Sequence, residues 1–422
     1  MRFDDFLKAA ARTPPAIVLH VAYACGIGII RDLGRHGVPV LGLDVNPRAI
    51  GLSSRYAAGK VCPDPLQDEA GFLAFLEDLG RQLPRKAVLF PTHDEFIWPL
   101  SRHAQRLGHW FIIPFSPWET MQRLHDKRAQ LEAAQRVGVG IPKTVFIDVS
   151  ADLERSIAEI AFPAIFKPVE SLAFKVRFQK HVLEIQSAEE LTKAYSKVDD
   201  CGTLMLQEIV PGGDEELWTL GSYLDAASRP LAVFTGHKLR QHPRRFGYCR
   251  FAVSSWDADL ADAGLRLLQE LRYHGVSQVE FKRDTRDGTF RLMEINARHW
   301  MWHSLAAACG VNLSLAAYRD AIGQPFIAPR QQDGRKWSVA MKDFSDSIRE
   351  VHRHELGVVE WLGSYRGLRV DGVLSFSDPL PGVISAGRIV RKGLARRARR
   401  AQPAAPGDAD GGVAAASDEE RP

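Results

Sequence analysis

Two stretches decide the fold of this chain, VEFKRD at residues 279–284 and LMEINAR at residues 292–298. Both alternate apolar and polar residues with a period of two, and the TRDG segment between them is typical of a turn. We therefore expect the two stretches to pair as an antiparallel hairpin. Glu280, Glu294 and Asn296 then share one face of that hairpin.

The side chains on this face indicate a metal site. Hard divalent cations such as Mg²⁺ bind a few protein oxygens and keep their remaining positions for water and phosphate oxygens. Two carboxylates and one amide oxygen fit that demand. The alternative is a surface hairpin with solvated charges, but the apolar residues that flank the acids favour the metal site.

The spacing of these residues resembles a known pattern. Glu280 is followed after thirteen residues by Glu294, then Asn296 and Arg298. This resembles the metal-binding signature of the ATP-grasp superfamily, and EFKRD with EINAR is similar to its carboxylate-amine ligases of the D-aspartate ligase type. The resemblance implies an α/β and α+β multidomain protein, in which an N-terminal open parallel α/β (pre-ATP-grasp) domain precedes a two-lobed ATP-grasp domain. It also implies ATP and Mg²⁺ as cofactors, with two ions expected and Mn²⁺ as an alternative.

Two lysines upstream agree with the resemblance. Lys127 opens an amphipathic stretch, 128–137, which ends at a glycine and is therefore expected to be a helix. The apolar stretch 162–168 delivers Lys167, which resembles the second phosphate lysine of the superfamily. A buried strand rarely tolerates an unpaired ammonium, so Lys167 either faces a cleft that holds an anion or snorkels to the surface.

The stretch LMLQEIVPGG at residues 204–213 resembles the hinge that grips the nucleotide between the lobes. By resemblance, the adenine-binding segment comprises Gln207, Glu208, Ile209 and Val210. An acid several residues later binds the ribose hydroxyls, and Glu215 is the first choice, with Glu216 close behind. An ordinary hairpin with an acidic turn is the alternative.

Three basic residues are the catalytic candidates. Lys238 and Arg240 are two residues apart in a predicted strand, so they are expected on one face, where related ligases hold the terminal phosphate. Solvent exposure explains them equally well. The planar fork of Arg298 suits the transferring phosphoryl group or a substrate carboxylate.

One segment departs from the superfamily pattern. Many of its members carry a glycine-rich loop after the second lysine, because glycine lets backbone N–H groups approach phosphates closely. Residues 169–176 contain no glycine, so Ser171 and Lys175 are expected to replace it. This departure supports an alternative function, a catalytically silent nucleotide-binding sensor or scaffold.

The first 120 residues are expected to form the open α/β domain. Its elements are predicted as strands at 16–21, 38–44 and 87–91 and a helix at 27–36. THDE at residues 92–95 follows a strand, where open α/β sheets place ligands, although helix capping by Thr92 or Asp94 is the favoured explanation.

Gly26 and Gly28 with Asp44 downstream would fit a nicotinamide-dependent oxidoreductase, the third function considered. The third glycine of the dinucleotide-binding pattern is missing, which weakens that hypothesis.

Length and composition bound the remaining possibilities. A chain of 422 residues exceeds one core. The predicted divisions are 1–120, an ATP-grasp domain at 121–325 (small lobe 121–205, large lobe 206–325), a C-terminal appendage at 326–390 and a disordered tail at 391–422. A helix is expected around 347–354. The formal charge of +4 includes a net +2 from the predicted tail, so the body has no footprint for nucleic acid.

The chain also lacks other signals. Its five cysteines include no CxxC pair, which argues against zinc or a disulfide framework and favours the cytoplasm. No signal peptide or transmembrane segment is expected, since the longest apolar stretch, 17–30, is short for a bilayer.

Together these features predict an ATP-dependent carboxylate-amine ligase. A small-molecule carboxylate attacks the γ-phosphate, and an amine traps the acyl phosphate to give an amide, ADP and phosphate. Such ligases are compatible with a homodimer, which nothing in these residues demonstrates. Four residues after the hairpin could line the acceptor pocket: His299, Trp300, Trp302 and His303. Aromatic residues at the start of a helix more often belong to the core, which is the alternative for these four.

Overall fold

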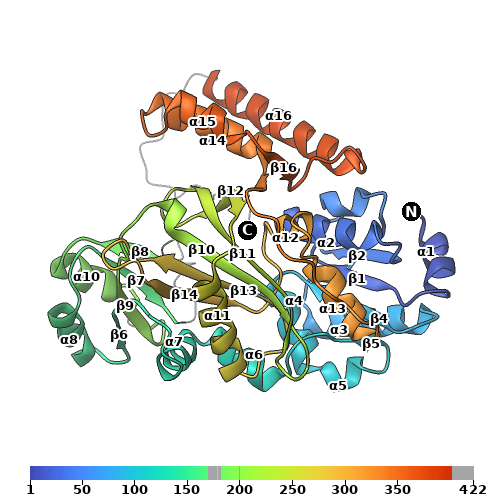
Figure 1. Cartoon of the computed structure of the whole chain (residues 1–422), viewed down its shortest axis with the longest axis horizontal. Helices are drawn as coiled ribbons and strands as arrows, with labels where there is room; N and C mark the ends of the chain where they lie inside the picture. The colour runs from blue at the N-terminus through green and yellow to red at the C-terminus, as the bar shows by residue number, and fades with distance from the viewer. Residues whose placement is uncertain (170–177, 179–181, 199, 402–422) are drawn as a thin grey trace, which may run out of the picture.

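The computed structural model describes residues 1–169, 178, 182–198 and 200–401, and contains three sheets within that part of the chain (Figure 1). The sheet orders are β3-β2-β1-β4-β5, β6-β9-β7-β8 and β14-β13-β10-β11-β12-β15-β16. This arrangement agrees with the expected N-terminal α/β domain followed by two lobes.

The first sheet is parallel throughout. Its strands are β1 (Ala16–Leu19), β2 (Val40–Asp44), β3 (Ala57–Val61), β4 (Ala87–Pro91) and β5 (Phe111–Ile112). Every residue of β1, β2 and β4 is buried, as expected when helices cover both faces of a parallel sheet. The helical elements are α1 (Phe3–Ala10), α2 (Ala24–Gly34), η1 (Ile50–Ser53), α3 (Glu69–Gln82), α4 (Asp94–Arg102) and α5 (Ala104–Leu107). The open parallel α/β domain is thus confirmed.

The small lobe is an antiparallel four-stranded sheet with helices. Its elements are β6 (Thr144–Ile147), α8 (Ala151–Glu159), β7 (Ala164–Pro168), β8 (Leu183–Ile185), α10 (Ala188–Tyr195) and β9 (Leu204–Glu208). Helices α6 (Trp118–His125) and α7 (Lys127–Arg136) precede this sheet, and their buried side chains belong to the core of the seven-stranded sheet. The Asp126 carboxylate caps α7 by accepting from the backbone N–H groups of Arg128 and Ala129. This cap fixes the position of Lys127 at the first turn.

The large lobe is built on the seven-stranded sheet. Its elements are η2 (Asp214–Glu216), β10 (Leu217–Leu224), β11 (Pro230–His242), β12 (Tyr248–Ser254), α11 (Ala258–Glu270), β13 (Gly275–Arg283), β14 (Phe290–Asn296), α12 (Ser304–Ala308), α13 (Leu313–Ala321) and β15 (Lys336–Ser338). Strands β13 and β14 pair antiparallel, which confirms the hairpin.

The N-terminal domain and the large lobe share one hydrophobic core. Side chains of α2 belong to the same buried cluster as Trp300 and Trp302. His299 and His303 are buried beside them. The core interpretation of these four residues is therefore correct. Because the two units are packed together, the carboxyl ends of β1 and β4 lie against the hairpin of the large lobe.

The C-terminal region differs from the expectation. It forms α14 (Ala340–His352), α15 (Val358–Ser364), β16 (Leu368–Asp371) and α16 (Pro379–Ala401). Strands β15 and β16 extend the seven-stranded sheet, so residues 326–390 do not form a separate appendage. The prediction of disorder from residue 391 is wrong for 391–401, which continue α16, while 402–422 lie outside the described residues. Within the described residues, no helix has the length and apolar character needed to cross a membrane.

Candidate active site

The centre of the candidate site is the face of the hairpin between β13 and β14. Glu280 lies directly opposite Glu294, and Gln278 lies opposite Asn296. The Gln278 side-chain amide donates to a Glu280 carboxylate oxygen at 2.8 Å, and the Asn296 amide donates to the Gln278 oxygen at 3.4 Å. Sequence reasoning missed Gln278, although its position two residues before Glu280 places it on the same face. Like charges directly opposite each other are destabilising, so a cation beside this pair would relieve their repulsion.

The donor set fits Mg²⁺ that is shared with a phosphate ligand. In the described part of the chain, no group of three or more His, Cys, Asp or Glu side chains could hold a metal ion. The two carboxylates and two amide oxygens of this face are too few to fill all six coordination positions of Mg²⁺. Phosphate oxygens and water supply the remaining positions in sites of this kind.

Lys238 approaches the carboxylates from β11. Its ammonium donates to Glu280 at 3.2 and 3.3 Å and to the Gln241 side-chain oxygen at 3.2 Å. The residue is only 6% exposed. Burial acts to lower the pKa of Lys238, but Glu280 and other negative groups raise it, and the net shift of the pKa is upward. Lys238 therefore stays positively charged at neutral pH.

Two further lysines come from β7 of the small lobe and from the start of α7. The Lys167 ammonium donates to the Gln207 side-chain oxygen at 3.1 Å, and Lys127 donates to the carbonyl oxygens of Pro168 and Val169 at 3.4 Å. Burial and the positive charge of Lys127 lower the pKa of Lys167 to about 8, against the opposite effect of Glu294. Two neighbouring cations with this little compensation form a site for an anion.

Arg240 does not lie beside Lys238, contrary to the expectation. A β-bulge shifts the register between Lys238 and Arg240, and a shift of one residue moves the following side chains to the opposite face. Arg240 instead forms a bidentate ion pair with Asp343 of α14, at 2.9 and 2.6 Å. Gln241 takes the place beside Lys238. The prediction that Lys238 and Arg240 together contact a phosphate is therefore wrong on geometric grounds.

The predicted nucleotide hinge follows β9. Gln207 connects Lys167 to Thr144, since its amide donates to the Thr144 hydroxyl at 2.8 Å. Glu208 accepts from the Lys143 backbone N–H at 2.8 Å. Ile209 is the next residue, partly exposed, and Val210 is buried. The side chains of Gln207 and Glu208 are thus held in place at the predicted hinge.

The two ribose candidates differ in their surroundings. Glu216 is engaged by Arg283, whose guanidinium donates to its carboxylate at 2.7 and 3.3 Å. Glu215 lies next to it in η2 and is exposed. Glu215 therefore remains the better candidate for a contact with ribose hydroxyls.

Arg298 connects the hairpin to the N-terminal domain. Its guanidinium donates to the Asp94 carboxylate at 3.0 Å. Burial acts to lower the pKa of Arg298, while Asp94 and Glu294 raise it, and the net shift of the pKa is upward. Helix α4 has no side-chain cap, so the prediction that Thr92 or Asp94 caps it is wrong. Thr92 donates instead to the carbonyl oxygens of Leu19 and His20.

Sequence reasoning also missed a histidine pair beside this connection. The rings of His20 and His93 lie 4.0 Å apart, and Tyr23 lies 5.3 Å from His20. His20 has a positive φ of 66°, and its buried Nδ1 has no hydrogen-bond partner in the described part of the chain. Burial and His93 lower the pKa of His20 to about 3, so the ring is neutral at pH 7. No local pattern in the sequence indicates this cluster.

Asp44 does not serve a dinucleotide. It is fully buried, and its carboxylate accepts from the backbone N–H groups of Val21 at 2.7 Å and Asn46 at 2.8 Å. A side chain held in this way is not available to a ribose hydroxyl, which removes the basis for the oxidoreductase hypothesis. Ser171 and Lys175, the predicted substitutes for a glycine-rich loop, lie outside the described residues.

Comparisons with known proteins agree with this geometry. The family model described as the carbamoyl-phosphate synthase L chain, ATP binding domain, matches residues 256–328. D-aspartate ligase of Enterococcus faecium (strain Aus0004) is 24% identical over 358 residues, which cover 74% of this chain and 85% of that protein.

Solved structures show the same fold. An L-amino acid ligase from Bacillus licheniformis has a TM-score of 0.59 at 15% identity, covering 77% of this chain and 78% of its own. The biotin carboxylase domain of the Hydrogenobacter thermophilus 2-oxoglutarate carboxylase, solved with MgADP, has a TM-score of 0.59 at 14% identity, covering 76% and 73%. The paired acids, the lysines near them and these similarities agree with the resemblance of the chain to ATP-grasp ligases.

Proposed function

We propose that this protein is an ATP-dependent carboxylate-amine ligase that forms an amide through an acyl phosphate and releases ADP and phosphate. One observation carries the proposal. Glu280 and Glu294 are opposed on one face, Lys238 contacts the first of them, and Lys127 and Lys167 lie together at the end of β7. Acids that could hold a metal, together with lysines that could contact phosphates, suit a triphosphate and its metal ion.

The chain's own residues divide the work of binding the phosphates. Lys127 at the start of α7 and Lys167 on β7 would neutralise the inner phosphates, while Lys238 on the large-lobe sheet would neutralise the terminal one. Mg²⁺ held by Glu280 and Glu294, with Asn296 as a further ligand, would withdraw charge from the phosphate oxygens. Two such ions, with Mn²⁺ as an alternative, are part of the proposal.

The reaction needs positioning and charge stabilisation rather than a protein nucleophile. A substrate carboxylate oxygen attacks the γ-phosphorus, and the bond from that phosphorus to the bridging oxygen of ADP breaks. The amine nitrogen then attacks the acyl carbon, expels phosphate and loses a proton. Arg298, whose guanidinium donates to Asp94, would orient the carboxylate or the transferring phosphoryl group with its planar fork.

The test is carboxylate-dependent release of ADP. Purified protein is incubated with ATP, Mg²⁺ and a panel of amino acids, other carboxylates and amines. The Lys167→Met variant is expected to lose turnover, because the buried ammonium has no replacement. Lys193→Met is the matched control, since Lys193 is an exposed small-lobe lysine paired with Glu189 on its own helix.

The outcomes separate the hypotheses. ADP release that requires a carboxylate, with an amide product found by mass spectrometry, supports the ligase. No carboxylate-dependent ADP across the panel rejects it. Binding of ATP without any turnover would support the nucleotide-binding sensor or scaffold that the glycine-free segment after Lys167 indicates.

A further inference from the structure

The C-terminal helices expose an unusual share of apolar side chains. More than half of the large apolar side chains that are exposed in the described residues fall between residues 340 and 390. Prominent among them are Phe344 and Ile348 on α14, Val359 and Leu362 on α15, Phe376 before α16 and Val383 on α16. Val359 is 87% exposed and Phe376 is fully exposed. An apolar surface of this kind marks an interaction site.

Helix α14 buries polar side chains and exposes apolar ones, which is the reverse of an ordinary surface helix. Its buried residues are Asp343, Asp346, Ser347 and Glu350, whereas Phe344 and Ile348 face outward. The buried acids pair with basic side chains of the large-lobe sheet, including Arg240 with Asp343 at 2.6 Å. The helix therefore docks on the protein through charges and presents its apolar side to the surroundings. Its outward face is not a remnant of the core.

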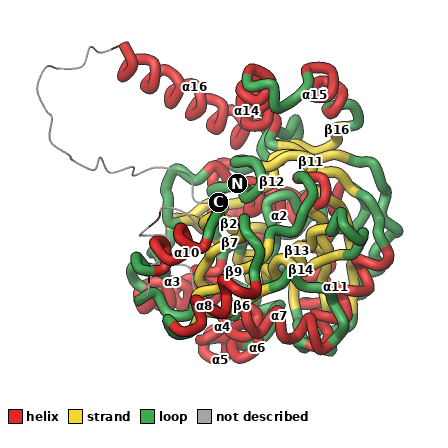
Figure 2. Tube along the Cα trace, turned by 90° about the vertical axis from the view of Figure 1, so that its left-hand side faces the viewer, coloured by secondary structure: helices red, strands yellow, loops and turns green. Residues whose placement is uncertain are grey.

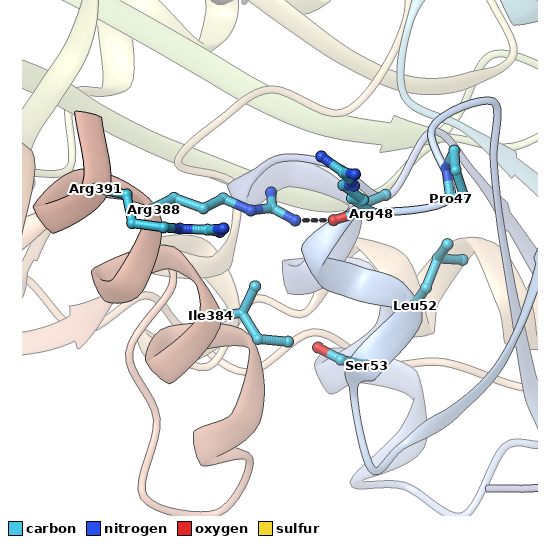
Figure 3. Close-up of a pocket in the computed structure, with 8 residues that line it drawn as sticks. Pro47, Arg48, Leu52, Ser53, Ile384, Arg388 and Arg391 are labelled. Carbon is cyan, nitrogen blue, oxygen red and sulfur yellow. Dashed lines mark hydrogen bonds between the residues drawn. The ribbon is translucent and has the colours of Figure 1, made fainter. Parts of the chain in front are cut away.

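Helix α16 adds positive charge to the same layer. Residues 379–401 include Arg388, Arg391, Lys392 and four further arginines, and no acid. Arg48, Arg388 and Arg391 line an open hollow of about 460 Å³ between η1 and α16 (Figure 3). Arg388 donates to the Arg48 carbonyl oxygen. Within the described part of the chain, these three guanidinium groups form no ion pair with a carboxylate, so the hollow suits an anionic group.

The three helices form one layer at an end of the molecule, and α16 projects from the body (Figures 1 and 2). We propose that this layer, α14 to α16, docks on an anionic lipid bilayer. Its apolar side chains enter the interfacial region, and the arginine hollow takes a lipid phosphate. Combined apolar and basic surfaces are what peripheral membrane helices use. A second copy of the chain fits less well, because a two-fold contact through α16 would bring the same basic residues together.

The test is co-sedimentation of the full chain with vesicles. Vesicles of phosphatidylcholine are compared with vesicles that also contain phosphatidylglycerol, at low and high salt. We expect binding to the anionic vesicles that weakens with salt and is at least tenfold weaker on phosphatidylcholine. Two variants, V359S/L362S/F376S and R388Q/R391Q, are each expected to weaken binding at least tenfold. All these side chains are at the surface, so unchanged circular dichroism should show that the fold is retained.

A matched variant, V149S/W256S/R123Q, removes two exposed apolar side chains and one exposed arginine from other surfaces and should bind as the parent does. No sedimentation with anionic vesicles would overturn the proposal, as would variants that bind like the parent. Binding of inorganic phosphate at the hollow without vesicle binding would assign it to a free anion instead. Analytical ultracentrifugation tests the remaining occupant, a second copy of the chain. The apolar surface would be assigned to a second copy if the parent formed a dimer, did not bind vesicles, and became monomeric in V359S/L362S/F376S.

Discussion

Replacing Arg240 by methionine tests whether this residue holds the C-terminal layer or a phosphate. Arg240 is 8% exposed and donates to Asp343 at 2.9 and 2.6 Å and to the Ser364 hydroxyl at 2.9 Å. Its guanidinium also lies 4.3 Å from the ring centroid of Phe251. Methionine keeps the aliphatic stem but leaves the Asp343 carboxylate with less compensation.

The expected cost follows from this geometry. Breaking a buried pair by removing one partner destabilises a protein by about 3–5 kcal/mol, because an uncompensated charge stays buried. Arg250 also lies 3.4 Å from Asp343, so we expect the lower end of that range. Asp343→Leu should cost a similar amount. The double variant should cost less than the two single changes together, because neither charge is then left without its partner.

Two assays separate the structural role from a catalytic one. The free energy of unfolding is measured by urea denaturation, and kcat/KM for ATP is measured where all variants are folded. We expect large losses of stability and little change in kcat/KM. Arg266→Met, which removes an exposed ion pair with Asp262, should change stability by only about 0–1 kcal/mol. The reasoning would be refuted if Arg240→Met kept its stability and lost about 10²-fold or more in kcat, as expected for a lost charge-stabilising group.

Three further predictions concern the candidate site. The pKa of Lys167 is lowered from 10.5 to about 8, so its charge is lost as pH rises through this value, and kcat/KM for ATP should fall there. Lys167→Arg, which stays charged, should lack that inflection, and an identical pH profile for both proteins would contradict the assignment. The same lowered pKa means that the buried charge of Lys167 destabilises the folded protein most strongly below pH 8. The free energy of unfolding should therefore increase as pH rises from 8 towards 10.5, because the folded protein loses this proton before the unfolded chain does. Glu280→Gln and Glu294→Gln should each raise the Mg²⁺ concentration for half-maximal ADP release by about 10- to 100-fold or more. Glu294→Gln should leave the metal-free protein at least as stable, because it relieves repulsion, whereas Glu280→Gln should destabilise it, because the buried Lys238 loses its carboxylate partner. An unchanged Mg²⁺ dependence would exclude these ligands. Arg298→Lys should lower kcat/KM for the carboxylate substrate by about 10²-fold through lost orientation, with the KM for ATP unchanged. A change confined to the KM for ATP would place Arg298 on the nucleotide instead.

Local patterns in the sequence were enough to predict the hairpin. Residues 279–284 and 292–298 alternate with a period of two around a turn, which predicts that the two strands pair as an antiparallel hairpin. Glu280 lies directly opposite Glu294 because a β-bulge between Glu280 and Phe281 shifts the register, which the period alone does not reveal. Lys127 and Lys167 were found from local patterns, since one begins a capped helix and the other ends a buried strand. The apolar runs of the N-terminal strands likewise predicted a parallel sheet.

Other features depend on contacts between distant residues. The bulge after Lys238 reverses which side chains share its face, and the period of the strand alone cannot reveal an inserted residue. Asp94 and Arg298 are paired across 204 residues by domain packing, and the sequence beside Asp94 resembles a helix cap.

The sequence by itself determined which residues could bind a metal and phosphates, because that information lies in residue type and short-range spacing. The tertiary structure alone decided which charges are free to bind a ligand, because a charge is engaged or available only according to what packs against it. Arg240 is held by the Asp343 carboxylate, whereas Lys167 donates to the uncharged side chain of Gln207.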